Sequence, residues 1–382
     1  MDDKDFDDIR PYRDNEIRSV LDRIRRHPWT IRTLRRFFFP RWSKKLAPLL
    51  DLYVRLYLKM RLISIHNVDD FHRRFIKKTI LHWTRQRTMT SFSYSGVEHV
   101  KRDQAVLYIT NHRDIVLDSA FLCYTLMDLG LRTPEIAFGD NLMLNDLVSD
   151  LIRINKAFIV RRNLSPKEQL KASIQLSKYM QYTLEKGDSI WLAQRGGRAK
   201  DGDDRTVPSI FKMVYLSQRQ GGMSFPDYMN FCNITPVAIS YEFDPCDVMK
   251  AKEIHSLKTT GDYLKKERED VISMLKGFNL PKGGVHYSFC PPVHGTFAND
   301  DEMALEVDRR IIANFRLWPA NYCAFDLLTG TEKYADKYNA AEKDAFLSRY
   351  HDQTPEVKSI IFQIYARPVI NKEELRLSDD IR

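Results

Sequence analysis

A histidine with two carboxylates close after it stands in the segment NHRDIVLD, residues 111–118. His112 is followed by Asp114 and Asp118. An imidazole beside a carboxylate can act as a general base, because the carboxylate orients the ring and stabilises the imidazolium that forms. A histidine in this position can also cap a helix or lie in a loop without a catalytic role. We therefore take His112 as a candidate base, with Asp118 or Asp114 as the group that orients it.

Glycines and cations that suit a phosphate group stand in two other segments. Paired glycines allow positive φ values and a close approach of the backbone to a ligand, while arginine and lysine donate to phosphate oxygens. Such residues are also common in ordinary turns and on solvated surfaces. The candidate ligands are Gly196, Gly197, Arg198 and Lys200 in RGGRAKDG, together with Arg161 and Arg162. A base, a glycine turn and several cations indicate transfer chemistry on an anionic substrate that carries a hydroxyl.

Two other kinds of site are disfavoured by the sequence. No Ser or Cys lies in a G-x-S-x-G elbow, so no covalent nucleophile is indicated. His286, Cys290 and His294 are spaced like metal ligands on one face of a strand, but Pro291 and Pro292 interrupt the run. We predict neither a metal nor another cofactor.

The candidate residues follow short apolar runs that predict β-strands. Helical patterns over 117–129 and 166–187 alternate with these runs. The alternation predicts an α/β fold with a mixed, largely parallel sheet flanked by helices. Ligands bind at the carboxyl ends of the strands in such sheets, and His112, Arg161 and Gly196 fall there. The predicted strands cover 105–110, 157–160, 189–193, 234–241 and 285–289.

Most of the positive charge lies in one early segment. Residues 1–22 carry a net charge of −4 and residues 23–87 carry +15, against +9 for the whole chain. Trp, Phe, Leu and Tyr side chains alternate with these cations, a pattern typical of amphipathic helices that lie on an anionic membrane surface. A helical subdomain with a solvated basic face is the alternative. The sequence contains no nucleic-acid-binding motif, so we predict no nucleic-acid partner.

The length of 382 residues and a hydrophobic content of 43% are those of a folded protein with a sizeable core. No segment reaches the ~20 uncharged apolar residues of a membrane-spanning helix, and the acidic start is unlike a secretory signal. Five cysteines without a C-x-x-C motif predict a reduced cytosolic setting. We expect a basic amphipathic helical region over 1–94, an α/β catalytic domain over 95–330 and a helical extension over 331–382. In that extension we expect a polar helix at 333–349 and a frayed tail from 371.

Four segments, in order, resemble the sequence blocks of the glycerophospholipid acyltransferase superfamily. They are NHRDIVLD (111–118), AFIVRR (157–162), IWLAQRGGRAKDG (190–202) and ITPVAIS (234–240). The resemblance covers roughly residues 95–295. It implies a His112 base oriented by Asp118, and binding of the acceptor phosphate by Arg198 and one of Arg161 or Arg162. It also places Pro236, the proline of the fourth block, among the substrate-binding residues.

The resemblance implies transfer of a fatty acyl group from acyl-CoA or acyl carrier protein to glycerol 3-phosphate or 1-acylglycerol 3-phosphate. It further implies a cytoplasmic enzyme bound peripherally to the inner face of the membrane. Two departures stand out. The spacing between His112 and Asp118 is one residue longer than usual in the family, which requires a local bulge or assigns the orienting role to Asp114. Arg195 stands where many members have an acidic residue.

These departures leave two alternatives open. An enzyme of this family could acylate another lipid acceptor, such as an acylated amino acid. A protein without activity could use the basic segment to bind membranes or nucleic acid.

Overall fold

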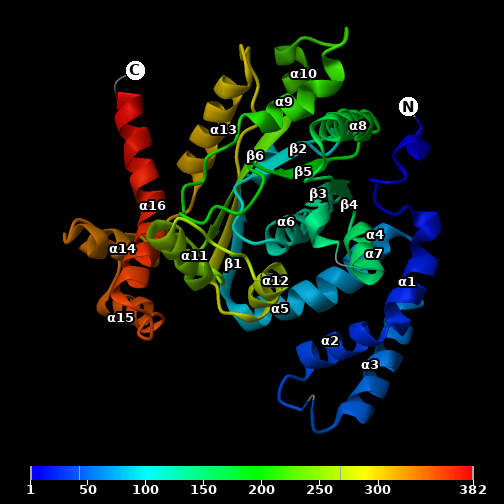
Figure 1. The fold of residues 1–382 in the computed structure, drawn as a ribbon, viewed down its shortest axis with the longest axis horizontal. Coiled ribbons are helices and arrows are strands. Elements are labelled where there is room, and N and C mark those ends of the chain that lie inside the picture. Colours follow the sequence, from blue (N-terminus) through cyan, green and yellow to red (C-terminus); the bar gives the residue numbers. More distant parts are fainter. Residues whose placement is uncertain (1, 43, 144, 267, 381–382) are drawn as a thin grey trace.

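The computed structural model describes residues 2–42, 44–143, 145–266 and 268–380. Its centre is a seven-stranded sheet with the order β1-β7-β6-β2-β5-β3-β4 (Figure 1). Strand β7 runs antiparallel to β6 and parallel to β1, and the remaining neighbours are parallel. The predicted α/β fold with a mixed, largely parallel sheet is confirmed. The strands are β1 (Met89–Ser95), β2 (Leu107–Thr110), β3 (Glu135–Gly139), β4 (Ala157–Val160), β5 (Ile190–Ala193), β6 (Ile234–Tyr241) and β7 (Gly283–Phe289).

Five of these strands lie within two residues of their predicted ends, whereas β1 and β3 were not predicted. Strand β1 lies at the edge of the sheet and reads MTSFSYS, with serine and threonine between the aromatic residues. An edge strand that is exposed on one side does not need a continuous apolar run, so the usual signal is absent. Strand β3 is short and begins with a charged residue, Glu135.

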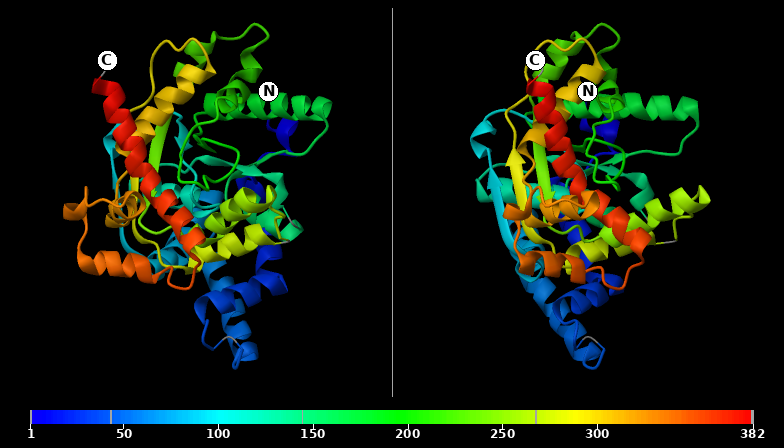
Figure 2. Two further views of the ribbon diagram at one scale, coloured as in Figure 1. Left: turned by 60° about the vertical axis from the view of Figure 1, so that its left-hand side comes forward. Right: turned by 90° about the vertical axis from the view of Figure 1, so that its left-hand side faces the viewer.

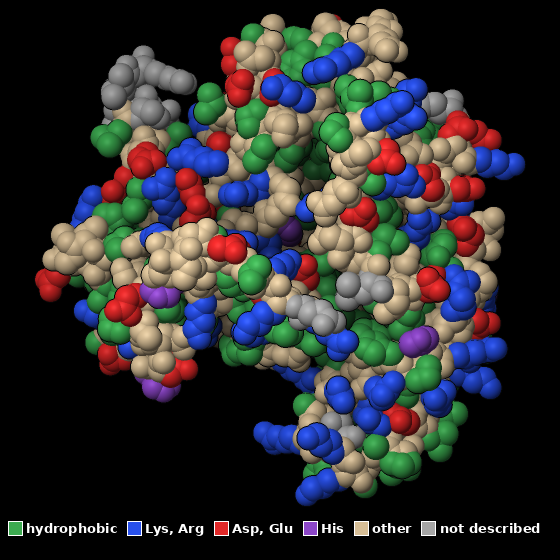
Figure 3. Space-filling model, viewed as in Figure 1, with side chains coloured by type: hydrophobic (Ala, Val, Ile, Leu, Met, Phe, Trp, Pro, Cys, Tyr) green, Lys and Arg blue, Asp and Glu red, His purple; other side chains and the backbone are tan. Residues whose placement is uncertain are grey.

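The N-terminal region is helical and forms a core of its own, in which α1 also packs against α7 (Asp146–Ile154). Both views of Figure 2 show α2 and α3 extending below the sheet, and Figure 3 shows Lys and Arg side chains around this extension. Among the described residues, no helix combines the length and apolarity needed to cross a bilayer. The helices of this region are α1 (Ile17–Arg26), α2 (Pro28–Phe38), α3 (Ala47–Leu62), α4 (Val68–Asp70), the π-helix η3 (Phe71–Leu81) and α5 (His82–Thr88).

Residues before α1 lie along the outer edge of the sheet. The backbone N–H of Ile159 in β4 donates to the carbonyl of Ile9 at 2.9 Å. Phe6 is buried in the main core, where its ring lies 5.1 Å from that of Tyr179. The N-terminal segment therefore covers β4, which would otherwise be an open edge strand. Its two short 3-10 helices are η1 (Asp3–Phe6) and η2 (Asp14–Glu16).

The C-terminal region differs from the prediction at two places. The predicted helix over 333–349 is observed as a short turn, η7 (Ala335–Lys337), followed by α15 (Ala340–Ser348). The tail predicted to fray from 371 is helical as far as 380, while 381–382 lie outside the described residues. Helix α16 (Pro355–Asp380) packs against α14 (Pro319–Thr329) and buries Ile361 and Ala366, and this tertiary packing stabilises a helix whose end the local sequence does not mark.

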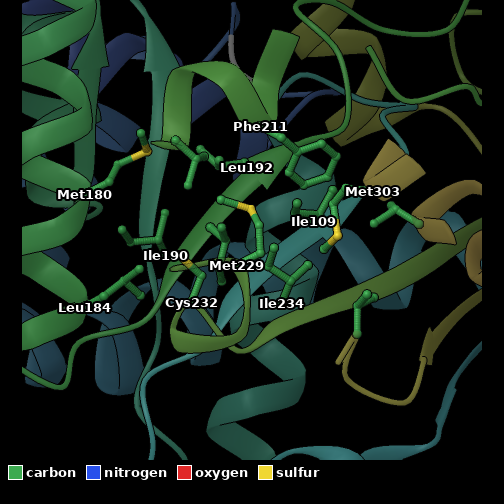
Figure 4. Close-up of a cluster of buried hydrophobic side chains, with 14 of the residues drawn as sticks. Ile109, Met180, Leu184, Ile190, Leu192, Phe211, Met229, Cys232, Ile234 and Met303 are labelled. Atoms are coloured by element: carbon green, nitrogen blue, oxygen red, sulfur yellow. The ribbon is translucent and has the colours of Figure 1, made fainter. Parts of the chain in front are cut away.

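Helices cover both faces of the sheet, and alternate strand residues enter two different cores. Leu107 and Ile109 of β2 face one core, whereas Tyr108 faces the other, against α6 (Leu117–Asp128). Figure 4 shows side chains of the first core, in which helical residues such as Met180, Phe211 and Met303 surround strand residues. Helices of this face are α8 (Pro166–Glu185), α9 (Ser209–Tyr215), α10 (Phe225–Phe231) and α13 (Asp300–Asn314). Burial on both faces fixes the strands whose ends carry the candidate residues.

Candidate functional site

His112 and Asp118 meet at the carboxyl end of β2. The Nδ1 atom of His112 lies 2.8 Å from Oδ2 of Asp118. The carboxylate is fully buried, while the imidazole keeps 13% of its side-chain surface exposed. Because the Asp118 carboxylate accepts a hydrogen bond from Nδ1, the proton of the neutral ring lies on Nδ1. The other ring nitrogen, Nε2, can then accept a proton. This is the arrangement of a general base with an orienting carboxylate.

Three further donors hold the Asp118 carboxylate. The backbone N–H groups of Arg113 and Asp114 donate to Oδ2 at 2.6 and 2.9 Å, and the Tyr241 hydroxyl donates to Oδ1 at 3.1 Å. Burial, and next the neighbouring Tyr287, raise the pKa of Tyr241 well above its ordinary value, so this phenol stays protonated and can donate. Asp118 therefore has one rigid position relative to His112.

Asp114 has a different environment. Its Oδ1 accepts from the backbone N–H groups of Val116 and Leu117 at 2.9 and 2.8 Å, so it caps the start of α6. Burial, and then the charge of Asp118, raise the pKa of the Asp114 carboxyl. Because the helix begins only at Leu117, the longer spacing is absorbed in the preceding turn and does not rotate Asp118 away from His112.

A buried asparagine joins the strands beneath the histidine. The Asn111 amide donates to the carbonyl of Ile239 at 2.9 Å and accepts from its N–H at 2.7 Å, which links β2 to β6. The same amide donates to Asp204 at 3.0 Å. Asn111 is part of the motif NHRDIVLD, but no role was predicted for it. Its role is the cross-strand contact with Ile239.

A chain of buried ion pairs lies behind this asparagine and was missed by the sequence analysis. Arg113 pairs with Asp204, and the Lys250 ammonium donates to the carbonyl of Arg113 at 3.1 Å and pairs with Asp244. Burial raises the pKa of Asp204 despite Arg113. At Asp244, burial is outweighed by Lys250, which lowers the pKa. No local motif predicts this chain, because Arg113 lies 91 residues from Asp204 and 137 residues from Lys250 in the sequence.

The glycine loop lies beside His112. The backbone N–H of Ala199 donates to the carbonyl of His112 at 3.0 Å. Gly196 and Gly197 are exposed, and a Cβ atom at either position would meet no atom within 4 Å. Neither glycine has a positive φ, so the left-handed backbone that glycine allows is not used here, and the glycines leave their peptide groups open to a ligand.

The two cations of this loop contact the segment between β6 and β7. Arg198 Nη2 lies 3.4 Å from the hydroxyl of Ser273 in α12 (Glu269–Asn279). Lys200 forms an ion pair with Glu253 in α11 (Asp247–Thr260). The hydrogen-bond partner of Arg198 is neutral and does not offset its positive charge. Glu253, in contrast, neutralises part of the positive charge of Lys200.

Arg161 and Arg162 point in opposite directions, as successive residues after a strand do. The Arg162 guanidinium donates to the carbonyl of Gly196 at 2.9 Å, so it lies at the glycine loop. Arg161 forms an exposed ion pair with Asp8 at 2.6 Å, on the side of the N-terminal segment. The structure therefore brings Arg162, and not Arg161, to the loop that carries Arg198.

Pro236, the remaining predicted substrate-binding residue, lies elsewhere, as do His286 and Cys290, which were considered as metal ligands and disfavoured. Pro236 is buried within β6 opposite Ile109, one residue before the pair that ends β2, and it is not brought to the loops. His286 contacts the hydroxyls of Ser93 and Ser95 at 2.8 and 3.0 Å. Cys290, considered beside it, is buried with its thiol 3.4 Å from the carbonyl of Arg310.

The face of the molecule that carries these loops is hollowed. Figure 3 shows a depression near its middle, with Lys and Arg side chains and apolar side chains around it. Arg162 and Arg198 at the glycine loop beside the His112 and Asp118 pair suit an acceptor that carries both an anionic group and a hydroxyl.

Comparison with known proteins gives consistent matches. Residues 91–240 match the family model described as Acyltransferase. The chain is 28% identical over 177 residues to a probable mitochondrial glycerol-3-phosphate acyltransferase of Caenorhabditis elegans. It is 30% identical over 184 residues to the glycerol-3-phosphate acyltransferase of Alteromonas mediterranea. The alignments cover 45% and 47% of this chain, and the chain spans only 22% and 20% of these relatives.

Among solved structures, the chain is similar to the 1-acyl-sn-glycerophosphate (LPA) acyltransferase PlsC of Thermotoga maritima. The match has a TM-score of 0.39 and 14% identity, and it covers 73% of this chain and 94% of that one.

Proposed function

We propose that this chain transfers a fatty acyl group from an acyl thioester to a glycerol phosphate, and the match of residues 91–240 to the acyltransferase family model supports this. The donor is acyl-CoA or acyl carrier protein, and the acceptor is glycerol 3-phosphate or its 1-acyl derivative. The observation that carries the proposal is the His112 and Asp118 pair beside the glycine loop. This loop contains Arg198 and accepts a hydrogen bond from Arg162. The names of the relatives support the choice of acceptor.

The proposed reaction follows from the free Nε2 of His112. This nitrogen removes the proton of the acceptor hydroxyl as the oxygen attacks the thioester carbonyl carbon. The tetrahedral intermediate then collapses, the carbon–sulfur bond breaks, and the leaving thiolate takes the proton from the imidazolium. Asp118 stabilises that imidazolium, while Arg162 and Arg198 bind the acceptor phosphate.

We also propose that the N-terminal region binds an anionic membrane, on the cytoplasmic face. Large apolar side chains of α2, α3 and the adjoining loops are exposed among the cations. Helices with this surface lie in the headgroup plane of a bilayer, where arginine and lysine meet phosphates. The exposed residues include Trp29, Trp42, Leu49, Leu52, Leu56, Met60 and Ile63.

The decisive assay offers purified protein both thioester donors, with glycerol 3-phosphate, 1-acylglycerol 3-phosphate and an acylated amino acid as acceptors. Acyl transfer to a glycerol phosphate is expected from the wild type and from His294→Ala, which alters a histidine in a distant exposed loop. His112→Ala should fold and lose transfer by ~100-fold or more. Full activity in a folded His112→Ala variant would contradict the proposed base, and product only from the amino-acid lipid would contradict the proposed acceptor.

A further inference from the structure

Helix α12 packs Phe278 against the core of the sheet but leaves two aliphatic side chains exposed on its outward face. Its inward face carries the small or polar residues Ser273 and Gly277, which are buried. Its outward face carries Ile272 and Leu275, exposed by 46% and 48%. A helix of a monomeric protein usually turns its large aliphatic residues inward and its polar residues to water. The exposed Ile272 and Leu275 indicate that the outward face of α12 contacts something other than water.

The inward face of α12 lies against the candidate site. A Cβ atom at Gly277 would lie 2.2 Å from Oδ2 of Asp114, so only glycine permits this close approach. Four residues earlier, Ser273 contacts Arg198. Since a helix with side chains is ~10–12 Å across, Ile272 and Leu275 lie about one helix diameter from these site residues.

The apolar surface continues into the segment between α11 and α12. Leu264 is 83% exposed, and Leu257 is also exposed. The right-hand view of Figure 2 shows this yellow-green segment projecting from the body of the molecule. Cations accompany the leucines. They are Lys258, Lys265, Lys266 and Lys276, and Asp262, Glu269 and Asp270 stand in the same segment, with Asp270 paired to Lys265.

We infer that the outward face of α12 and the adjoining loop around Leu264 form a second membrane-contact surface, next to the site and distinct from the exposed apolar side chains of α2 and α3. Exposed leucine and isoleucine flanked by lysines match the acyl boundary and the anionic headgroups of a bilayer. The inference rests on the proposed function, because a bilayer at α12 brings lipid acyl chains within about one helix diameter of Arg198.

A fluorescent probe at position 275 tests this contact. All five native cysteines are buried, so a cysteine introduced at the surface is the one that a thiol reagent labels. Leu275→Cys and the control Leu305→Cys would each carry an environment-sensitive fluorophore. Leu305 is 67% exposed on α13, which covers the other face of the sheet.

With vesicles of phosphatidylcholine and phosphatidylglycerol in equal parts, the emission at 275 should shift to shorter wavelength and be quenched by nitroxide on the lipid acyl chains. The probe at 305 should show neither effect. An unshifted probe at 275 would overturn the inference, whether or not the protein sediments with the vesicles. A probe at 275 that responds to acyl carrier protein and not to vesicles would overturn it in favour of a protein partner.

A second measurement separates this inference from the proposed function. The double variant Ile272→Ser, Leu275→Ser should bind these vesicles roughly tenfold more weakly, because two aliphatic side chains are lost from the buried face. Its transfer of an acyl group to the water-soluble glycerol 3-phosphate should equal that of the wild type. Unaltered vesicle binding contradicts the contact at α12, whereas absence of acyl transfer in the wild type contradicts the proposed function alone.

Discussion

At the level of single residues, the two aspartates near His112 differ in what they contact. Asp118 accepts from the imidazole, whereas Asp114 accepts from backbone N–H groups at the start of α6. Replacing Asp118 by asparagine keeps the size of the side chain but removes the negative charge that stabilises an imidazolium. We expect kcat of Asp118→Asn to fall by ~100-fold or more, with little change in melting temperature. Steady-state acyl transfer and thermal unfolding measure the two effects.

Asp114→Ala serves as the matched variant. Loss of a helix cap lowers stability by ~1 kcal/mol, so its melting temperature should fall by a few degrees while kcat stays within about tenfold of the wild type. The opposite pattern, with Asp114→Ala folded but inactive and Asp118→Asn active, would reassign the orienting role to Asp114.

The two neighbouring arginines provide a second pair. Arg162 lies at the glycine loop, whereas Arg161 pairs with Asp8 at the surface. Loss of a hydrogen bond from a charged donor weakens binding by ~1.5–3 kcal/mol, so Arg162→Gln should raise KM for the acceptor by roughly 10-fold to 100-fold. Arg161→Gln should leave KM within about twofold, since exposed ion pairs contribute little. Equal effects of both substitutions on KM would show that Arg162 does not bind the acceptor.

At the level of elements, the π-helix η3 carries a buried histidine that makes the fold sensitive to acid. His72 lies 3.3 Å from the hydroxyl of Thr133, and burial, with Lys156 next, lowers its pKa to about 3. The unfolded chain binds a proton below pH ~6.5, whereas the folded chain does not until the pH approaches 3. The contribution of His72 to stability is therefore full above pH ~6.5 and is lost as the pH falls toward 3.

This linkage predicts a difference between wild type and His72→Gln. Between pH 6.5 and 5, the wild type should lose ~2 kcal/mol of unfolding free energy that the variant does not lose. Urea unfolding at both pH values measures the difference, and His351→Gln, at an exposed site, provides the control. Parallel pH profiles for wild type and His72→Gln would show that His72 is not the sensitive group.

Helix α3 has an exposed apolar face that substitution can test without disturbing its core. Deletion of residues 23–61 would also remove buried residues such as Ile31 and Val54, so loss of binding could reflect unfolding. Leu52 and Leu56 are exposed. Changing both to serine should weaken binding to anionic vesicles at least roughly tenfold with an unchanged melting temperature, as vesicle sedimentation would show. Unchanged binding would contradict a membrane role for α3.

At the level of the whole molecule, the sequence predicts the strands with continuous apolar runs, including the edge strand β4, and misses β1 and β3, of which β3 lies inside the sheet. Strands buried on both faces carry continuous apolar runs, and β4 and β6 were placed with their observed bounds. The serine-rich edge strand β1 has no such run. Helix α16 persists to 380 through packing with distant helices, which local residues do not encode.

Some contacts of the candidate site could be predicted from the sequence and others could not. His112 and the glycine loop follow predicted strands, so their proximity follows from the sheet topology. Arg162 and Arg161 could not be told apart, because both follow β4 and their directions depend on distant partners, the carbonyl of Gly196 and the carboxylate of Asp8. The inward face of α12 could not be predicted at all, since its contact with Asp114 spans much of the chain.

The position of the N-terminal segment against β4 also determines when that segment can be buried during translation. Arg13 donates to Glu135 and lies near Tyr179, which follow it by 122 and 166 residues. At ~5–20 residues per second, a ribosome needs roughly 10 to 30 s to supply these partners. Phe6 and Ile9 emerge first but must remain unburied for that period. The β4 edge of the sheet is therefore covered by residues synthesised long before it, and any factor that shields nascent apolar segments would act there.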